Sequence, residues 1–208
     1  MRENLSSFLA RMRAVFGEDD VHRIHNAYIV AKEEFRSKTR KERDALGKPV
    51  RYFEHLRHVA IIMVEEAGCR DAYAVIAALL HDAIEDTRLS LAFIETVFGR
   101  GVAQEVSQVS KVPKEGYLRR LVSFGTWKTF RLKACDRLHN LRTLHHGSVE
   151  FRRTQLAETE HEYYPLFDRM VDECPMRERG NMRNLRRLIH EEVANQRRLL
   201  DQAIAATA

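Results

Sequence analysis

The spacing of apolar residues constrains the fold of this chain more than any other feature. Alternating apolar and polar residues, typical of half-buried strands, are scarce, and the 208 residues include only 9 Gly and 4 Pro. Apolar side chains three and four positions apart share one face of a helix. The pattern therefore predicts an all-α fold. It begins with Leu5, Phe8, Leu9, Met12 and Phe16, and continues with Val21, Ile24, Tyr28 and Phe35.

Capping and breaking residues place the predicted helix ends. Gly68 and Gly99 follow apolar segments and can end helices, Asp71 can cap the start of the next one, and Pro165 predicts a bend. We expect roughly nine or ten helices in one domain over residues 1–208, with loops over 36–49 and 113–125. The later helices are expected near 52–67, 71–81, 90–98, 102–109, 126–144, 150–170 and 179–205.

Bulk properties narrow the setting of the protein. No apolar run approaches the roughly 18 residues needed to cross a bilayer, so no membrane association is expected. The three widely spaced cysteines fit reduced thiols in a cytoplasmic protein better than a disulfide framework. The net charge of +5 is compatible with nucleic acid or with a small phosphorylated ligand and decides between neither.

At the run HDAIEDT, residues 81–87, the sequence changes abruptly from apolar residues to residues that can bind a metal or transfer a proton. His81 and Asp82 follow the apolar stretch AVIAALL, and Glu85 and Asp86 come four residues after them. Imidazole and carboxylate together suit divalent ions such as Mn²⁺, Fe²⁺ or Zn²⁺. An isolated His-Asp pair is more often a solvated helix end, so the interpretation depends on other residues.

Two further candidate ligands lie in apolar helical segments. His55 belongs to RYFEHLRHVAII, and Asp136 belongs to RLKACDRLHNLRTL, where it precedes His139 and Asn140. With His81 and Asp82 they give the order His, His-Asp, Asp. Two imidazoles and two carboxylates carry a charge of about −2, which neutralises a divalent ion.

That order resembles the HD-superfamily metal-dependent phosphohydrolases. The segments AALLHDAIEDT, SKVP, KACDRLHNLRTL and ETEHEYYPL further resemble the hydrolase domain of RelA/SpoT-type alarmone enzymes over roughly residues 20–170. HD alone is a weak motif, but HDxxEDT followed by DRLHNxRTL is highly specific. The resemblance implies an all-α HD bundle with a helical extension over 171–208, similar to a stand-alone small alarmone hydrolase. Such enzymes remove the 3′-pyrophosphate of guanosine tetra- or pentaphosphate, usually with Mn²⁺.

The resemblance also implies roles for individual residues. His55, His81, Asp82 and Asp136 are the expected metal ligands. Glu85 and Asp86 are expected to orient or deprotonate the attacking water. The candidate substrate-binding residues are Arg40, Lys41, Lys111, Arg137, Asn140, Thr143 and Tyr164.

Several alternatives stay open at this point. The substrate could be an adenosine alarmone, because neither Asn140 nor Thr143 alone distinguishes guanine from adenine. An HD-family nucleotidase would share the four ligands, and a nucleotide-binding sensor would need no catalysis. The basic, aromatic run LRRLVSFGTWKTFRLK could stack on bases, but its Phe124, Trp127 and Phe130 are expected in the core, so nucleic acid is not the expected partner. The sequence is compatible with a monomer or a homodimer.

Overall fold

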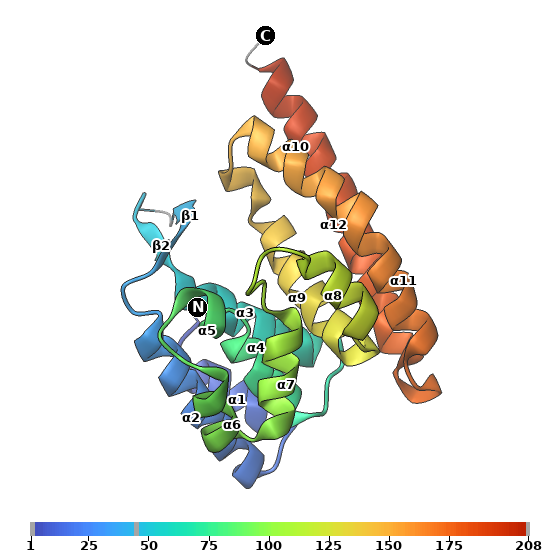
Figure 1. The fold of residues 1–208 in the computed structure, drawn as a ribbon. Coiled ribbons are helices and arrows are strands. Elements are labelled where there is room, and N and C mark those ends of the chain that lie inside the picture. Colours follow the sequence, from blue (N-terminus) through green and yellow to red (C-terminus); the bar gives the residue numbers. More distant parts are fainter. Residues whose placement is uncertain (1–2, 44–45, 207–208) are drawn as a thin grey trace.

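The computed structural model describes residues 3–43 and 46–206; the ends of the predicted 1–208 domain and residues 44–45 lie outside it. The described residues form twelve α-helices and a two-stranded hairpin, in agreement with the predicted all-α class (Figure 1). Since α5 is a single turn and α10 continues into α11, ten main helices remain. The elements are α1 (Leu5–Arg13), α2 (Glu18–Glu34), β1 (Thr39–Arg43), β2 (Pro49–Arg51), α3 (Tyr52–Glu65), α4 (Ala72–Leu80), α5 (Ala83–Asp86), α6 (Leu91–Phe98), α7 (Arg100–Val109), α8 (Tyr117–Phe124), α9 (Trp127–Arg142), α10 (Val149–Glu158), α11 (Tyr164–Glu173) and α12 (Arg179–Ala205).

Helix α9 lies in the middle of the bundle and packs against α3, α7, α11 and α12. Its apolar residues are buried, as are several charged residues on the same helix, including Lys133, Asp136 and Arg137. Buried charges are costly unless they are paired, so these side chains require partners within the protein. A helix in this position therefore brings reactive groups into the interior.

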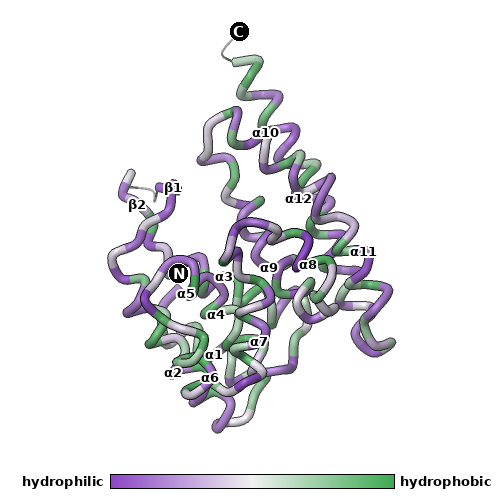
Figure 2. Tube along the Cα trace, in the orientation of Figure 1, coloured by the Kyte–Doolittle hydropathy of each residue, from purple (hydrophilic) through white to green (hydrophobic). Residues whose placement is uncertain are grey.

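Helix α4 is buried except at Tyr73 and ends where the HDAIEDT motif begins. Its residues are uniformly apolar, which the hydropathy colouring shows (Figure 2), and the Asp71 side chain caps its start by accepting from Tyr73 N. His81 is its last, capping residue, and Asp82 precedes the single turn α5. The chain thus leaves the helix inside the molecule, so the polar motif begins at a buried histidine and continues through partly buried residues.

The predicted loop over 36–49 contains a β-hairpin that the sequence pattern did not indicate. Strand β1 pairs antiparallel with β2, and residues 44–45 lie outside the described part. The β1 sequence TRKER lacks apolar residues, yet Arg40 and Glu42 are half-buried while their neighbours are exposed. The strand alternates between solvent and a polar interior surface, so hydrophobic alternation could not reveal it.

A second difference lies in the predicted loop over 113–125, where Tyr117–Phe124 form α8. Tyr117 and Leu121 are buried on one face of this short amphipathic helix. Of the three aromatic residues expected in the core, Phe130 is buried and Trp127 is partly buried, but Phe124 is 70% exposed. The expectation for Phe124 was wrong because it ends α8 on the solvent side.

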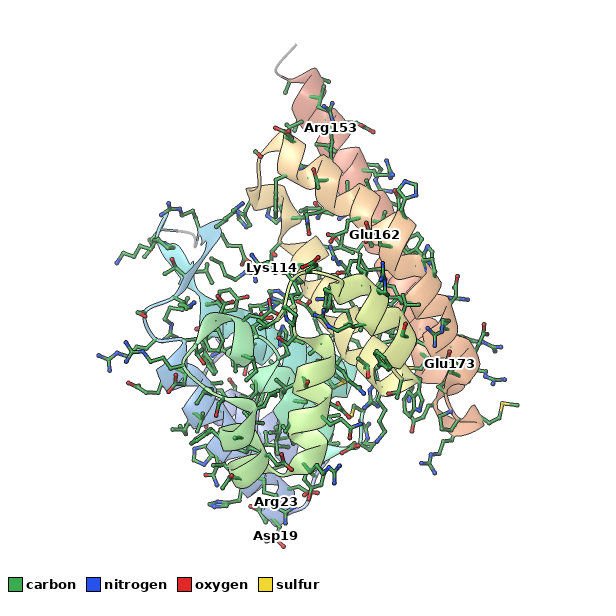
Figure 3. All side chains as sticks on the ribbon, in the orientation of Figure 1. Asp19, Arg23, Lys114, Arg153, Glu162 and Glu173 are labelled. Carbon is green, nitrogen blue, oxygen red and sulfur yellow. The ribbon has the colours of Figure 1, made fainter. Side chains whose placement is uncertain are left out.

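Helices α10 and α11 form one rod that packs along α12 (Figure 1). The predicted bend at Pro165 corresponds to a π-helical turn over Thr159–Tyr163, after which Pro165 lies in the first turn of α11. Charged residues of the rod, such as Arg153 and Glu173, point into solvent (Figure 3). None of the described helices combines the length and the apolar character that crossing a bilayer requires. The division into one domain with an extension over 171–208 stays a prediction.

Candidate active site

The four predicted ligand residues lie together where α3, α4, α5 and α9 meet. Nε2 of His55 is 3.3 Å from Oδ1 of Asp136 and 3.7 Å from Oδ2 of Asp82. Nε2 of His81 is 3.1 Å from Oδ2 of Asp82 and 3.7 Å from Oδ1 of Asp136. Two imidazole nitrogens and two carboxylate oxygens from three distant parts of the chain therefore form one cluster, in which the ligand atoms of His55, His81 and Asp82 all lie within 4.8 Å of one another.

The protein leaves one donor atom of this cluster without a hydrogen bond. His81 is 3% exposed, and its Nδ1 lies 2.8 Å from the Ala78 carbonyl oxygen. This contact keeps a proton on Nδ1 and turns Nε2, the nitrogen that would bind a metal, toward the cluster. Nε2 has no aligned hydrogen-bond partner among the described residues, although Asp82 is close. A buried polar atom without a partner indicates a missing ligand, and a metal ion fits that requirement.

The predicted ligand Asp136 is fixed on both of its oxygens. Lys133 donates to Oδ2 across 2.8 Å, and Asn140 Nδ2 donates to Oδ1 across 2.6 Å. The predicted ligand His55 is held on its other ring nitrogen, because its Nδ1 lies 2.9 Å from Nδ1 of His139. Hydrogen bonds of this kind orient metal ligands and set the tautomer of a ligand imidazole.

The charges of the cluster determine its protonation state before a metal binds. Burial alone would lower the pKa of His81, but Asp82 and Asp136 raise it to about 10. Burial would raise the pKa of both carboxyls, but His81 holds that of Asp82 low, and Lys133 holds that of Asp136 low. A proton on His81 therefore supplies positive charge between the two carboxylates. A divalent ion would supply that charge instead and displace the proton, so these residues fit such an ion.

Glu85 and Asp86 lie at the edge of this cluster and are held by different partners. Oε1 of Glu85 accepts the backbone N–H of Lys111 across 2.7 Å. Burial raises the pKa of Glu85, partly opposed by that hydrogen bond. Asp86 accepts from Lys38 across 2.9 Å. Glu85 is therefore an oriented carboxylate with an elevated proton affinity, which suits a group that accepts a proton.

A cavity of about 420 Å³ opens above the cluster. Its walls come from the hairpin, α3, α5, the end of α9, the 3₁₀ turn Leu144–His146 and the start of α10. A volume of this size suits a nucleotide. The lining residues are Thr39, Arg40, Lys41, Glu42, Tyr52, His55, Asp82, Glu85, Asp86, Lys111, Asp136, Asn140, Thr143, Leu144, His146, Gly147, Phe151 and Gln155.

The hairpin delivers two of the predicted substrate-binding cations to this cavity. Nη2 of Arg40 donates to Oδ1 of Asn140 across 2.8 Å and lies 3.5 Å from Oγ1 of Thr143. Nζ of Lys41 lies 4.1 Å from the centre of the Phe151 ring on α10. These contacts connect the hairpin to the opposite wall, so groups from β1, α9 and α10 face the same space.

Two predicted substrate-binding residues lie elsewhere. Arg137 is buried, donates to Gln155 and Glu158, and stacks 4.0 Å over the Tyr163 ring. Tyr164 packs 4.0 Å from the ring of His190 on α12. Neither residue lines the cavity. Their part in substrate binding stays a prediction, because successive residues of a helix face different directions and only one position in three or four can face a given cavity.

The structure adds residues that the sequence interpretation missed. Tyr52 donates to Oδ2 of Asp82 across 2.7 Å, Lys38 pairs with Asp86, and Glu42 pairs with Arg40. Phe151 provides an aromatic wall. The position of Tyr52, three residues before His55, was a usable signal. Lys38 and Glu42 could not be found without the hairpin.

Comparisons with known proteins show which proteins this chain is similar to. The HD domain family model matches residues 27–170. Over 165 residues the chain is 33% identical to the bifunctional (p)ppGpp synthase/hydrolase SpoT of Escherichia coli, which covers 74% of this chain and 22% of that relative. Over 172 residues it is 30% identical to the guanosine-3′,5′-bis(diphosphate) 3′-pyrophosphohydrolase MESH1 of Drosophila melanogaster, covering 80% of this chain and 90% of MESH1.

The fold comparison gives the same result. A solved structure of a metazoan ortholog of SpoT, described as hydrolysing ppGpp, matches with a TM-score of 0.62 and 28% identity, covering 85% of this chain and 96% of the other. The protein therefore belongs to the HD domain family. Within that family it is homologous to the SpoT-type hydrolases and to MESH1, and it spans about a fifth of the SpoT length.

Proposed function

We propose that this protein is a metal-dependent hydrolase that removes the 3′-pyrophosphate of guanosine tetra- or pentaphosphate, giving GDP or GTP and pyrophosphate. The observation that carries the proposal is the position of the four-residue ligand cluster and Glu85 at the base of a nucleotide-sized cavity. The printed activities of MESH1 and of the SpoT ortholog support the same reaction.

The ligand residues would hold one divalent cation. His55 and His81 would bind through Nε2, while Asp82 and Asp136 would bind through the oxygens that face these nitrogens. When bound, such an ion lowers the pKa of water and neutralises phosphate charge. The chain holds the donors in place through Ala78, Lys133 and Asn140, so little reorganisation accompanies binding.

Glu85 is the residue that we assign to proton transfer. It lines the cavity, the backbone N–H of Lys111 holds its carboxylate, and its raised pKa favours accepting a proton from water. The water oxygen attacks the phosphorus attached to the ribose 3′ oxygen, the P–O3′ bond breaks, and the 3′ oxygen takes up a proton. Asp86, whose carboxylate accepts from Lys38, would orient either the attacking water or the chain segment that contains Asp86 itself.

The substrate would lie between the hairpin and α9. Arg40, Lys41 and Lys111 line the cavity and supply positive charge for the phosphates, while Asn140 and Thr143 supply polar contacts beside the ligand cluster. Charge complementarity of this kind lowers KM and depends on ionic strength.

Three finer assignments belong to the same proposal. Manganese is our choice of metal, because it accepts mixed nitrogen and oxygen donors and is usual for the family that the sequence resembles. Three buried thiols support a reducing, cytoplasmic setting. The partner is a small nucleotide, and the protein would act as a monomer or homodimer.

A nucleotide panel tests the proposed reaction. Purified protein is incubated with guanosine and adenosine 3′,5′-bispyrophosphates, GTP and GMP, with Mn²⁺ or with EDTA. We expect metal-dependent cleavage of the 3′-pyrophosphates and no loss of 5′ phosphates. Release of orthophosphate from GMP would indicate a nucleotidase, and binding without turnover would indicate a sensor.

A further inference from the structure

Glu42 is a carboxylate that faces the substrate cavity without a role in the metal site. It lies on β1, and its side chain is 13% exposed. Oε1 accepts from Nε of Arg40 across 2.6 Å, since residues two apart on a strand share one face. The pair lies against the wall formed by α9 and the following 3₁₀ turn, where Arg40 also contacts Asn140 and Thr143.

The other acidic residues of the cavity all belong to its catalytic end. Asp82 and Asp136 are ligand residues, and Glu85 and Asp86 follow in the same motif. Glu42 comes from the hairpin, and the lining contributed by the 3₁₀ turn and α10 includes the apolar side chains of Leu144 and Phe151. The cavity thus has a cation-binding end and a second region in which one carboxylate lies among apolar walls and the two hairpin cations Arg40 and Lys41.

The chemistry of a carboxylate limits what can lie against Glu42. An ionised carboxylate only accepts hydrogen bonds, and it repels phosphate. A 3′-pyrophosphorylated nucleotide has anionic groups on both sides of its ribose, so its neutral, planar base is the part that suits an apolar wall with an acceptor. Guanine and adenine differ in the hydrogen-bond donors on the base edge that contains N1. Guanine offers N1–H and a 2-amino group side by side, whereas adenine offers a 6-amino donor beside an unprotonated N1.

We infer that Glu42 is a specificity-determining residue that accepts hydrogen bonds from N1–H and the 2-amino group of guanine. Adenine would place the lone pair of N1 against the carboxylate, with one donor instead of two. Arg40 holds Glu42 in place and balances its charge. This inference rests on the proposed function, because it selects the guanosine alarmone that the sequence alone left open.

A simpler role for Glu42 would be to orient Arg40 alone. Loss of Glu42 would then weaken every nucleotide to the same extent, because the charge and shape of Arg40 act on any base or phosphate. A base-reading role changes the ratio between bases. The ratio of the affinities for guanine and adenine nucleotides therefore separates the two roles.

The test measures binding of GDP, IDP and ADP by isothermal titration calorimetry in the presence of Mn²⁺. These nucleotides lack the 3′ group, so no 3′-pyrophosphate is cleaved. We expect wild-type protein to bind GDP about tenfold or more tightly than ADP, the discrimination of a bidentate pair. IDP lacks the 2-amino group and should bind about threefold or more weakly than GDP, a comparison that needs no variant.

Glu42→Gln should lower the GDP to ADP affinity ratio about fivefold or more, because an amide can pair with either base. The matched control is Glu34→Gln, an exposed glutamate of α2 that lines no part of the cavity and should leave the ratio unchanged. Equal affinities for GDP and ADP in the wild type, or an unchanged ratio in Glu42→Gln, would overturn the inference. Base-selective binding by a protein that hydrolyses no 3′-pyrophosphate would contradict the proposed function instead.

Discussion

The hydroxyl of Tyr52 donates a hydrogen bond to Oδ2 of Asp82 across 2.7 Å, and this oxygen faces both ligand imidazoles. Burial and then the Asp82 charge raise the pKa of Tyr52, so the hydroxyl stays a donor. The ring stacks on Phe35, which fixes its orientation. A residue outside the metal cluster therefore sets the direction of a ligand.

Removing this hydroxyl should weaken metal binding without unfolding the protein. For Tyr52→Phe we expect metal affinity to fall about tenfold, within the range for lost outer contacts of metal ligands. Metal-competition titration measures the change, and circular dichroism checks the fold. Tyr73→Phe is the matched control, since it removes an exposed tyrosine hydroxyl that contacts Arg23 far from the site. An unchanged metal affinity in Tyr52→Phe would show that Asp82 does not depend on this contact.

Metal binding should release a proton. In the metal-free protein the pKa of His81 is raised to about 10 by its carboxylate neighbours, so the imidazole is protonated at neutral pH. A metal must displace that proton, and affinity should rise about tenfold per pH unit between roughly pH 7 and 9. Calorimetry in buffers of different ionisation enthalpy should give about one proton released per ion. Heats that do not depend on the buffer would contradict the protonated His81.

Glu85→Gln should retain the metal and lose turnover. The amide keeps the size of the side chain but cannot accept a proton, so kcat should fall about 10²-fold or more. Glu95→Gln on α6 is the control, because Glu95 lines no part of the cavity. Wild-type rates in Glu85→Gln would remove it from the mechanism.

The raised pKa of Glu85 predicts where activity falls on the acid side of the pH–rate profile (the acid limb). Burial raises the pKa of Glu85, and protonation removes the base. Activity should therefore fall as pH drops through a value above that of an ordinary glutamate, and the limb should disappear from the residual activity of Glu85→Gln. An unchanged limb in that variant would assign it to another group.

Replacing the cavity cations Arg40 and Lys41 should have a different effect from replacing the buried Arg137. Replacing Arg40 and Lys41 together with Ala should raise KM at least tenfold and weaken the salt dependence of kcat/KM. Arg137→Gln should instead cost about 2 kcal/mol of stability, because it loses buried bonds to Glu158, with little change in KM. Chemical denaturation and steady-state kinetics measure the two effects. The reverse pattern would restore Arg137 as a substrate contact.

The sequence predicted the helices and the ligand cluster for the same physical reason. Long apolar repeats and capping residues such as Asp71 act locally, and each candidate ligand lay in or directly after an apolar helical segment that had to be buried. The family resemblance then supplied the roles that spacing alone could not.

The parts of the fold and of the site that the sequence did not predict depend on tertiary contacts. The strand β1 has no apolar pattern because its inner side chains, Arg40 and Glu42, face a polar cavity. Arg137 and Tyr164 were placed by their proximity in sequence to reactive residues, whereas their direction depends on helix packing. Local patterns carry little information on which way such side chains point.

Isotope incorporation tests the central claim most directly. The metal-free protein is given guanosine 3′,5′-bispyrophosphate in ¹⁸O-labelled water, Mn²⁺ is added, and the products are analysed by mass spectrometry. The account predicts no product before the metal and then unlabelled GDP with pyrophosphate carrying one ¹⁸O, because water attacks the phosphorus beside the ribose 3′ oxygen. Turnover without metal, labelled GDP, or orthophosphate as the first product would contradict it.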